Sequence, residues 1–303
     1  MPDVILHHYD SSPFSEKVRI CFGIKGLAWR AAQQPVIMPK PDLIQLTGGY
    51  RRIPVMQLGA DIYCDSALIV RELDRRFPQP PLYPAGSQTL ATAIEQWADK
   101  GLFQSAVLAI FGSIGDGVDP AFIKDREALS GQPFNVAAMK AHAPFALTQI
   151  QAHAALLAQQ LEDGQAFLNG DRPCLADAAA YYNFWFLRTF CPGLADQFED
   201  IAGFDAWYDR VGSIGHGLRT EITPADTLAF AAASQPVTIG CLARDTVLLG
   251  HPVALAASDY GRDPIEGAFA GSTQFSLSVT RDVPGLGQIN VHVPRLGYSV
   301  TPA

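Results

Sequence analysis

The fold is decided by residues 4–26, which read VILHHYDSSPFSEKVRICFGIKG. Val4–Tyr9 alternate loosely between apolar and polar side chains and predict a first strand. Ser12 and Pro13 follow at once and predict the start of a helix, because serine caps a helix N-terminus and proline is favoured in its first turn. One apolar helix face is then formed by Phe14, Val18, Cys21 and Phe22. Gly26 is expected to end this helix.

The next fifty residues predict a small mixed unit in the order βαβαββα. The expected elements are a strand at 29–35, a loop with a short helix at 39–47, a hairpin at 53–58 and 61–63, and a helix capped by Asp65-Ser66 that runs to Phe77. We therefore place a compact α/β domain at residues 1–78.

A proline-rich linker at 79–86 separates this unit from a helical one at 87–235. The helical segments are expected at 87–110, 136–162, 175–190, 204–211 and 224–233, with a glycine-rich break at 112–118. After Pro236 the sequence changes to short alternating runs separated by Gly, Pro and Asp. These runs predict a small β-rich module at 236–303, of the kind seen in SH3-like barrels.

Composition restricts the class of protein. The hydrophobic content of 48% with 17% charged residues is typical of a globular chain, and the net charge of −8 argues against nucleic acid or anionic membrane as the main partner. No apolar run is long enough to span a bilayer, and the N-terminus lacks a signal-peptide pattern. The five cysteines are scattered without CxxC spacing, which favours free thiols in a reducing cytoplasm and gives no metal site.

Several motifs, in this order, resemble those of the cytosolic glutathione S-transferase superfamily. They are Ser12-Pro13-Phe14-Ser15 before Lys17-Val18-Arg19-Ile20, then Arg52-Ile53-Pro54-Val55, Asp65-Ser66 before an apolar helix, the proline linker, and Gly170-Asp171-Arg172-Pro173 before Leu175-Ala176-Asp177. The resemblance covers roughly residues 1–233. It implies a thioredoxin-like domain that binds glutathione, followed by an all-helical domain.

The resemblance assigns the catalytic position to Ser12, by its spacing to Arg19. A hydroxyl there, at a helix N-terminus that favours anions, would donate a hydrogen bond to the glutathione thiolate and lower the thiol pKa. Ser11 and Ser15 are alternatives, because a one-residue insertion would shift the match. Serine at both Ser12 and Ser15 leaves no thiol for a mixed disulfide, which favours attack on an electrophile. Ser12 also has a purely structural reading, as an ordinary helix cap.

The resemblance also assigns a glutathione-binding set. Its members are Phe14, Lys40, Arg52, Ile53, Pro54, Asp65 and Ser66. Ile53-Pro54 is expected to form a cis-proline turn whose backbone pairs with the cysteinyl part, and Arg52 is expected beside the glycine carboxylate. Asp65 and Ser66 lie at the expected N-terminus of a helix and are expected to bind the γ-glutamyl carboxylate and amine. Lys40 and Arg52 also fit ordinary surface charge, and the Asp65-Ser66 pair also fits an ordinary helix cap.

The helical unit supplies candidates for a second-substrate pocket and a structural cap. Tyr181, Trp185 and Arg188 lie in one aromatic helix and are the pocket candidates, although most aromatic residues there fit a core. Cys174 stands where the family has Ser or Thr, so Asp177 is expected to carry more of that helix cap.

The expected function is a cytoplasmic, homodimeric glutathione transferase of the detoxification type, which uses Ser12 to join glutathione to a small apolar electrophile without a metal. Glutathione-dependent isomerisation or peroxide reduction shares the same first step. A protein of this fold that binds glutathione with little or no turnover is the alternative from another class.

Overall fold

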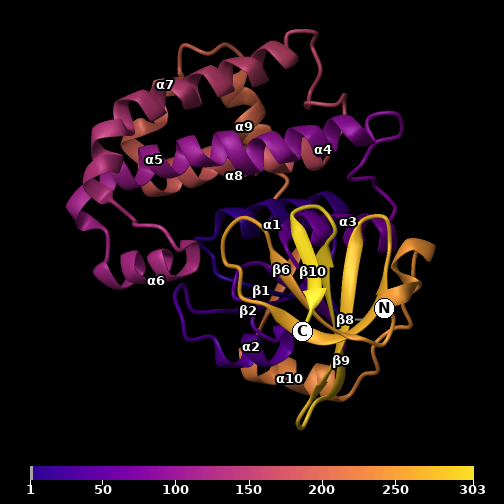
Figure 1. The fold of residues 1–303 in the computed structure, drawn as a ribbon. Helices are drawn as coiled ribbons and strands as arrows, with labels where there is room; N and C mark the ends of the chain where they lie inside the picture. Colours follow the sequence, from indigo (N-terminus) through magenta and orange to yellow (C-terminus); the bar gives the residue numbers. More distant parts are fainter. Residues whose placement is uncertain (1–2) are drawn as a thin grey trace.

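The computed structural model describes residues 3–303, and Figure 1 shows a sheet-containing lobe beneath a lobe of helices. The first lobe begins with β1 (Ile5–His8), α1 (Pro13–Lys25), β2 (Ala28–Gln33), α2 (Pro41–Thr47), β3 (Val55–Leu58), β4 (Asp61–Cys64) and α3 (Ser66–Arg76). This is the expected order, and the thioredoxin-like domain is confirmed. Strand β1 pairs with β2 in parallel and with β3 antiparallel, and the Ile53–Pro54 peptide bond is cis as expected.

Helix α1 starts and stops where the sequence predicts. The Ser12 hydroxyl accepts a hydrogen bond from the Ser15 amide at 3.2 Å, and Pro13 occupies the first turn. Gly26 ends the helix with φ 61°, a left-handed conformation that glycine adopts without steric cost. The helix lies between the sheet and α8 (Leu175–Phe190), so both of its faces are buried.

The helical lobe contains one continuous rod and a helix that was not predicted. The rod consists of α4 (Gln88–Trp97), a π-helical turn (Ala98–Leu102) and α5 (Phe103–Ile114). Helix α6 (Pro120–Ser130) was missed, although Asp119 caps it and Pro120 takes its first position. The remaining helices are α7 (Val136–Gln160), α8 and α9 (Phe204–Gly212).

Asp177 caps the start of α8, as expected because the sulfur of Cys174 is a poor hydrogen-bond acceptor. Its carboxylate accepts from the amides of Leu168 and Cys174 at 2.9 and 3.0 Å, and from the Trp207 indole at 3.0 Å. Because Asp177 is buried, these three donors replace the water that the carboxylate loses on folding.

The C-terminal strands continue the thioredoxin-like sheet instead of forming a separate barrel. Strands β6 (Pro252–Ala257), β7 (Ile265–Ser272), β8 (Ser276–Val283), β9 (Gly287–Pro294) and β10 (Tyr298–Pro302) form the β-rich region. The ten-stranded sheet has the order β10-β6-β7-β8-β9-β4-β3-β1-β2-β5, so the expected SH3-like barrel is wrong. Within the first domain alone, one edge of β4 would be left without a partner strand. Strand β9 pairs with that edge in parallel.

Two elements from the predicted helical unit also belong to the sheet lobe. Strand β5 (Leu218–Ile222), which was not predicted, pairs in parallel with β2, and α10 (Pro224–Ala232) packs beside α2. In Figure 1, α2 and α10 lie on the side of the sheet away from the helical lobe. The predicted boundaries at 78 and 235 otherwise stay predictions.

The β4–β9 junction is built around one buried carboxylate. Asp61 accepts from the Nε2 of His292 at 3.0 Å, from Nδ2 of Asn290 at 3.2 Å and from the Val237 amide at 3.1 Å. The Tyr63 ring stacks on His292 with centroids 4.4 Å apart. The C-terminal strands therefore share a polar network and an apolar core with the first domain.

Candidate functional site

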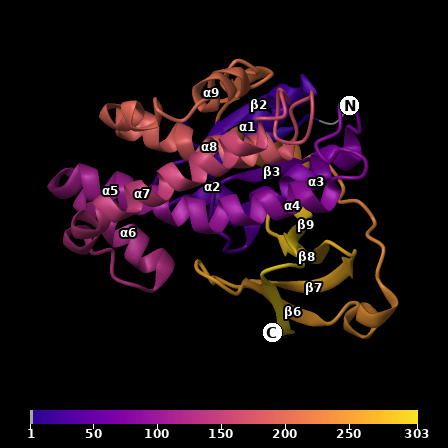
Figure 2. The same ribbon diagram turned by 90° about the horizontal axis from the view of Figure 1, so that it is seen from above.

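A cavity of about 410 Å³ opens where the first domain, helix α4 and the C-terminal strands meet. Figure 2 shows these strands beside α3 and α4. The first domain contributes Phe14, Tyr50, Arg52, Ile53, Pro54, Asp65, Ser66, Ala67, Leu68 and Arg71. The rod α4 and its π-turn contribute Thr92, Glu95, Gln96, Asp99 and Lys100, and the C-terminal region contributes Ser258, Asp259, Tyr260, Phe275, Pro294, Leu296, Gly297 and Tyr298.

The structure brings most of the predicted glutathione-binding set to this cavity. The cis-proline turn Ile53-Pro54, Arg52 and the start of α3 at Asp65-Ser66 all line it, as does Phe14. These residues come from separate loops at one end of the sheet, and the fold brings them together around one cavity. The C-terminal wall was not predicted, because nothing in its local sequence indicates which surface it covers.

Asp65 caps α3 with an unusual backbone. Its carboxylate accepts from the Ala67 amide at 3.0 Å, and its φ of 77° is the only positive value among non-glycine residues in the described part of the chain. Such a conformation costs free energy and is concentrated at functional sites. The second carboxylate oxygen accepts from the Tyr298 hydroxyl at 3.1 Å.

Arg52 is held from the opposite side by the loop after β6. Its guanidinium pairs with Asp259 and lies over the Tyr260 ring, 3.8 Å from the centroid. Burial lowers the pKa of Arg52, but the neighbouring tyrosines and Asp259 together outweigh burial and raise it, so the guanidinium keeps its charge. Arg52 and Asp65 therefore both contact the C-terminal region.

The wall formed by the α4 rod carries two carboxylates that pair with a buried lysine. The Nζ of Lys17, which is fully buried, contacts Glu95 at 3.0 Å and Asp99 at 2.6 Å, and the Tyr182 hydroxyl donates to Asp99 at 3.0 Å. Burial raises the pKa of Asp99 to about 6, although Lys17 acts in the other direction. Asp99 lies in the π-helical turn, a rare helix irregularity that is frequent at functional sites.

Ser12 lies at the N-terminus of α1 but does not line the cavity. Only 1% of Ser12 is exposed, and its described hydrogen bond is the helix cap. The Ser15 hydroxyl is buried without a hydrogen-bond partner, and Ser11 is half-buried. Sequence reasoning missed Tyr9, whose hydroxyl-bearing side chain lies beside Ser12: burial raises the pKa of Tyr9, while Arg126 and Ser12 lower it in part.

Lys40 lies apart from the cavity. Only 2% of it is exposed, and its Nζ donates to the Val36 carbonyl at 3.5 Å. Burial lowers the pKa of Lys40 to about 8, with Asp125 opposing that shift. Asp125 belongs to α6 and pairs with Arg51 at 2.6 Å, so the helix that was not predicted covers this side of the first domain.

The three predicted second-substrate residues also lie outside the cavity. The Tyr181 ring packs at a tilt against Tyr208 of α9, with centroids 4.8 Å apart. Arg188 pairs with Asp205 and lies over the Tyr208 ring. Trp185 packs near Arg19, with the guanidinium 5.6 Å from its ring.

A row of aromatic rings runs from Phe14 along α5. Phe103 lies 4.7 Å from Phe14, Phe186 lies 6.4 Å from Phe103, and Phe111 lies 6.5 Å from Phe186 and 5.4 Å from Phe122. All except Phe186 are half-buried, so the row presents apolar surface beside the start of α1. The sequence signal was present as isolated phenylalanines, but their alignment depends on helix packing.

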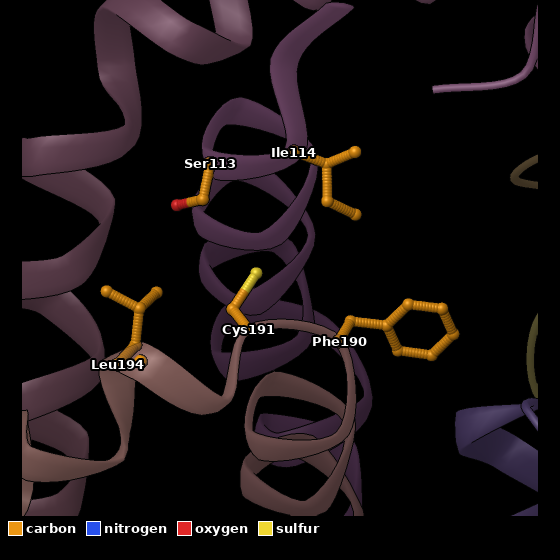
Figure 3. A pocket seen from close by; sticks show the side chains of 6 residues that line it. Ser113, Ile114, Phe190, Cys191 and Leu194 are labelled. Carbon is orange, nitrogen blue, oxygen red and sulfur yellow. The ribbon is translucent and has the colours of Figure 1, made fainter. Parts of the chain in front are cut away.

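A second hollow of about 400 Å³ lies between α5 and the end of α8 (Figure 3). It is lined by Ser113, Ile114, Phe190, Cys191, Gly193 and Leu194. Burial raises the pKa of the Cys191 thiol, which disfavours the reactive thiolate. Within residues 3–303 no group of His, Cys, Asp and Glu side chains is arranged to hold a metal, and no helix is long and apolar enough to cross a membrane.

Comparison with known proteins identifies both the first domain and the whole architecture. A family model described as the glutathione S-transferase N-terminal domain matches residues 6–81, and one described as a domain of unknown function matches residues 107–212. A crystal structure of a GST-like protein from Pseudomonas syringae is 33% identical and covers 100% of both chains, with a TM-score of 0.79. A Tau class glutathione S-transferase from mango, at 18% identity, covers 69% of this chain and 88% of its own with a TM-score of 0.53, which shows the fold alone.

Curated relatives match a shorter region. Glutathione S-transferase U4 of Arabidopsis thaliana is 27% identical over 30% of this chain and 41% of its own length. A probable glutathione S-transferase of Solanum tuberosum is 30% identical over 40% of this chain and 56% of its own. The chain thus spans about half the length of the curated relatives it matches.

Proposed function

The chain belongs to the glutathione S-transferase superfamily, and we propose that it binds glutathione in the cavity beside α3 and joins it, through its sulfur, to an apolar electrophile. The observation that carries the proposal is the convergence of Arg52, the cis Ile53-Pro54 turn and the Asp65-Ser66 cap on one cavity. These groups match the three parts of the tripeptide in order: a cation for the glycine carboxylate, an extended backbone for the cysteinyl unit, and a helix N-terminus for the γ-glutamyl carboxylate.

In this proposal Ser12, which does not line the cavity itself but lies two residues before the lining residue Phe14, acts on the sulfur at the start of α1. Its Oγ caps α1. The serine hydroxyl would donate a hydrogen bond to a thiolate beside it, and the positive end of the helix dipole would stabilise the same anion. Both effects favour the anion and lower the thiol pKa. Tyr9 is a second hydroxyl of the same neighbourhood and could donate to the same anion.

The sulfur would then form a bond to an electrophilic carbon as the leaving group departs or as a conjugated double bond takes up the electron pair. The half-buried row of aromatic rings that starts at Phe14 and Phe103 offers an apolar surface and so supports an apolar electrophile as the second substrate. Isomerisation or peroxide reduction by the same thiolate stays an alternative, as does a glutathione-binding protein with little turnover. The homodimer and the cytoplasmic location expected from the sequence stay predictions.

Titration calorimetry with glutathione tests the proposal, with the thiol pKa of the bound ligand read from its ultraviolet absorbance. We expect binding that Arg52→Ala weakens by about tenfold or more, because a charge-assisted hydrogen bond contributes about 1.5–3 kcal/mol. Absence of binding to the unaltered protein would refute the proposal. Binding without a lowered thiol pKa would favour the binding-protein alternative.

A further inference from the structure

Both charged residues proposed to hold the ends of glutathione already have partners within the chain. Asp259, in the loop between β6 and β7, places its carboxylate on the Arg52 guanidinium. Tyr298, at the start of β10, donates its hydroxyl to Asp65. Asp259 and Tyr298 also line the cavity themselves, so these contacts are made inside the site.

The Arg52 partner has the same chemistry as the ligand group that Arg52 is proposed to bind. A glycine carboxylate that approaches Arg52 meets a cation whose charge Asp259 already balances. Both residues line the cavity, and the Asp259 side chain is 60% exposed while that of Arg52 is only 11% exposed, so the carboxylate is the more accessible member of the pair. Two carboxylates on one guanidinium repel each other, and sharing the guanidinium weakens each hydrogen bond.

The loop that carries Asp259 is anchored to α6 and closed by a hydrogen bond of its own. The Gly261 amide donates to the Leu129 carbonyl at the end of α6 at 2.7 Å, and the Arg262 Nε donates to the Asp259 carbonyl at 2.9 Å. Gly261 has φ 54°, and a Cβ there would lie 2.8 Å from Leu129 and 2.9 Å from the Arg52 side chain. The close seat of this loop between α6 and Arg52 holds Asp259 in position.

We propose that Asp259 is a specificity-determining residue that makes this site prefer γ-glutamylcysteinyl thiols whose glycine end is uncharged over free glutathione. An ester or amide at that end still accepts a hydrogen bond from Arg52 but does not compete with Asp259 for its charge. The inference rests on the proposed function, since it assumes that the thiol occupies the cavity beside Arg52.

The test is titration calorimetry of the full chain with two ligands, glutathione and its glycyl ethyl ester. The unaltered protein should bind the ester at least as tightly as glutathione. Asp259→Asn should raise the affinity for glutathione by about fivefold or more and change the affinity for the ester by less than about twofold. The reason is that glutathione, unlike the ester, carries a negative charge beside the substituted group. Asp259→Ser gives a second variant that removes the charge with a smaller side chain.

Asp263→Asn is the matched control. It makes the same change in charge in the same loop, but Asp263 is exposed and does not line the cavity. We expect it to leave the ratio of the two affinities unchanged. An unaltered protein that favours glutathione over the ester, or an Asp259→Asn protein with the original ratio, would overturn the inference while leaving glutathione binding intact. Failure of both thiols to bind any of these proteins would instead overturn the proposed function, and the inference with it.

Discussion

Replacing Ser12 by alanine separates the catalytic reading of this residue from its role as a helix cap. A hydrogen bond to a charged group contributes about 1.5–3 kcal/mol, and one pKa unit corresponds to about 1.4 kcal/mol. Loss of the hydroxyl should therefore raise the pKa of the bound thiol by about one to two units. The Ser12 Oγ also accepts from the Ser15 amide at 3.2 Å, so unfolding should become easier by about 1 kcal/mol.

The assay is the pH dependence of conjugation, with the thiolate absorbance of bound glutathione measured in parallel. At neutral pH the rate of Ser12→Ala should fall about tenfold or more, and it should recover as the pH passes the raised thiol pKa. A variant that is merely less stable would not recover in this way. Urea unfolding at the same pH values gives the structural cost separately.

Ser15→Ala is the matched control, because the Ser15 hydroxyl is buried without a hydrogen-bond partner and its removal should leave stability unchanged or improved. An unchanged thiol pKa in Ser12→Ala would refute the reasoning. A shift in Ser15→Ala or Ser11→Ala of the same size would move the assignment to that residue.

Three further predictions concern stability, measured by urea unfolding. Lys40→Met should stabilise the fold by about 1–3 kcal/mol at neutral pH, because burial lowers the pKa of Lys40 to about 8 and the charged amine is disfavoured in the folded state. The unfolded chain keeps its proton up to about pH 10.4, so this gain should shrink from pH 8 to that value, and a gain independent of pH would contradict the cause. Cys174→Ser should stabilise α8 by about 0.5–1 kcal/mol, because oxygen accepts from the helix amides better than sulfur; a loss of stability would show that the sulfur is needed for packing. Asp61→Ala should cost about 2–4 kcal/mol, because it leaves buried donors of His292 and Asn290 unpaired, and it should open the β4–β9 junction to proteolysis; a cost below 1 kcal/mol would contradict that network.

Local sequence signals were sufficient for the first domain and most helices. The cap at Ser12, the stop at Gly26 and the Asp65 cap act within a few residues of themselves, so their effect is visible in the sequence. The aromatic helix α8 shows the limit of this reasoning. Tyr182, not Tyr181, contacts Phe14 and Asp99, and a shift of one residue turns a side chain about 100° around the helix. Apolar residues surround α8 on nearly every side, so no pattern distinguishes the two faces.

The order of the elements in the first domain was thus determined by the sequence, because periodicity, caps and turn residues act locally, while the candidate glutathione-binding residues followed from the resemblance of their motifs. Only the tertiary structure decided which strands extend the sheet, since the pairing of β9 with β4 and of β5 with β2 depends on edges that are left open after the first domain forms. It also decided that Asp259 reaches Arg52 across 207 positions of the chain and that Tyr298 reaches Asp65 across 233. Such contacts follow from where whole strands are placed, and no short stretch of sequence carries that information.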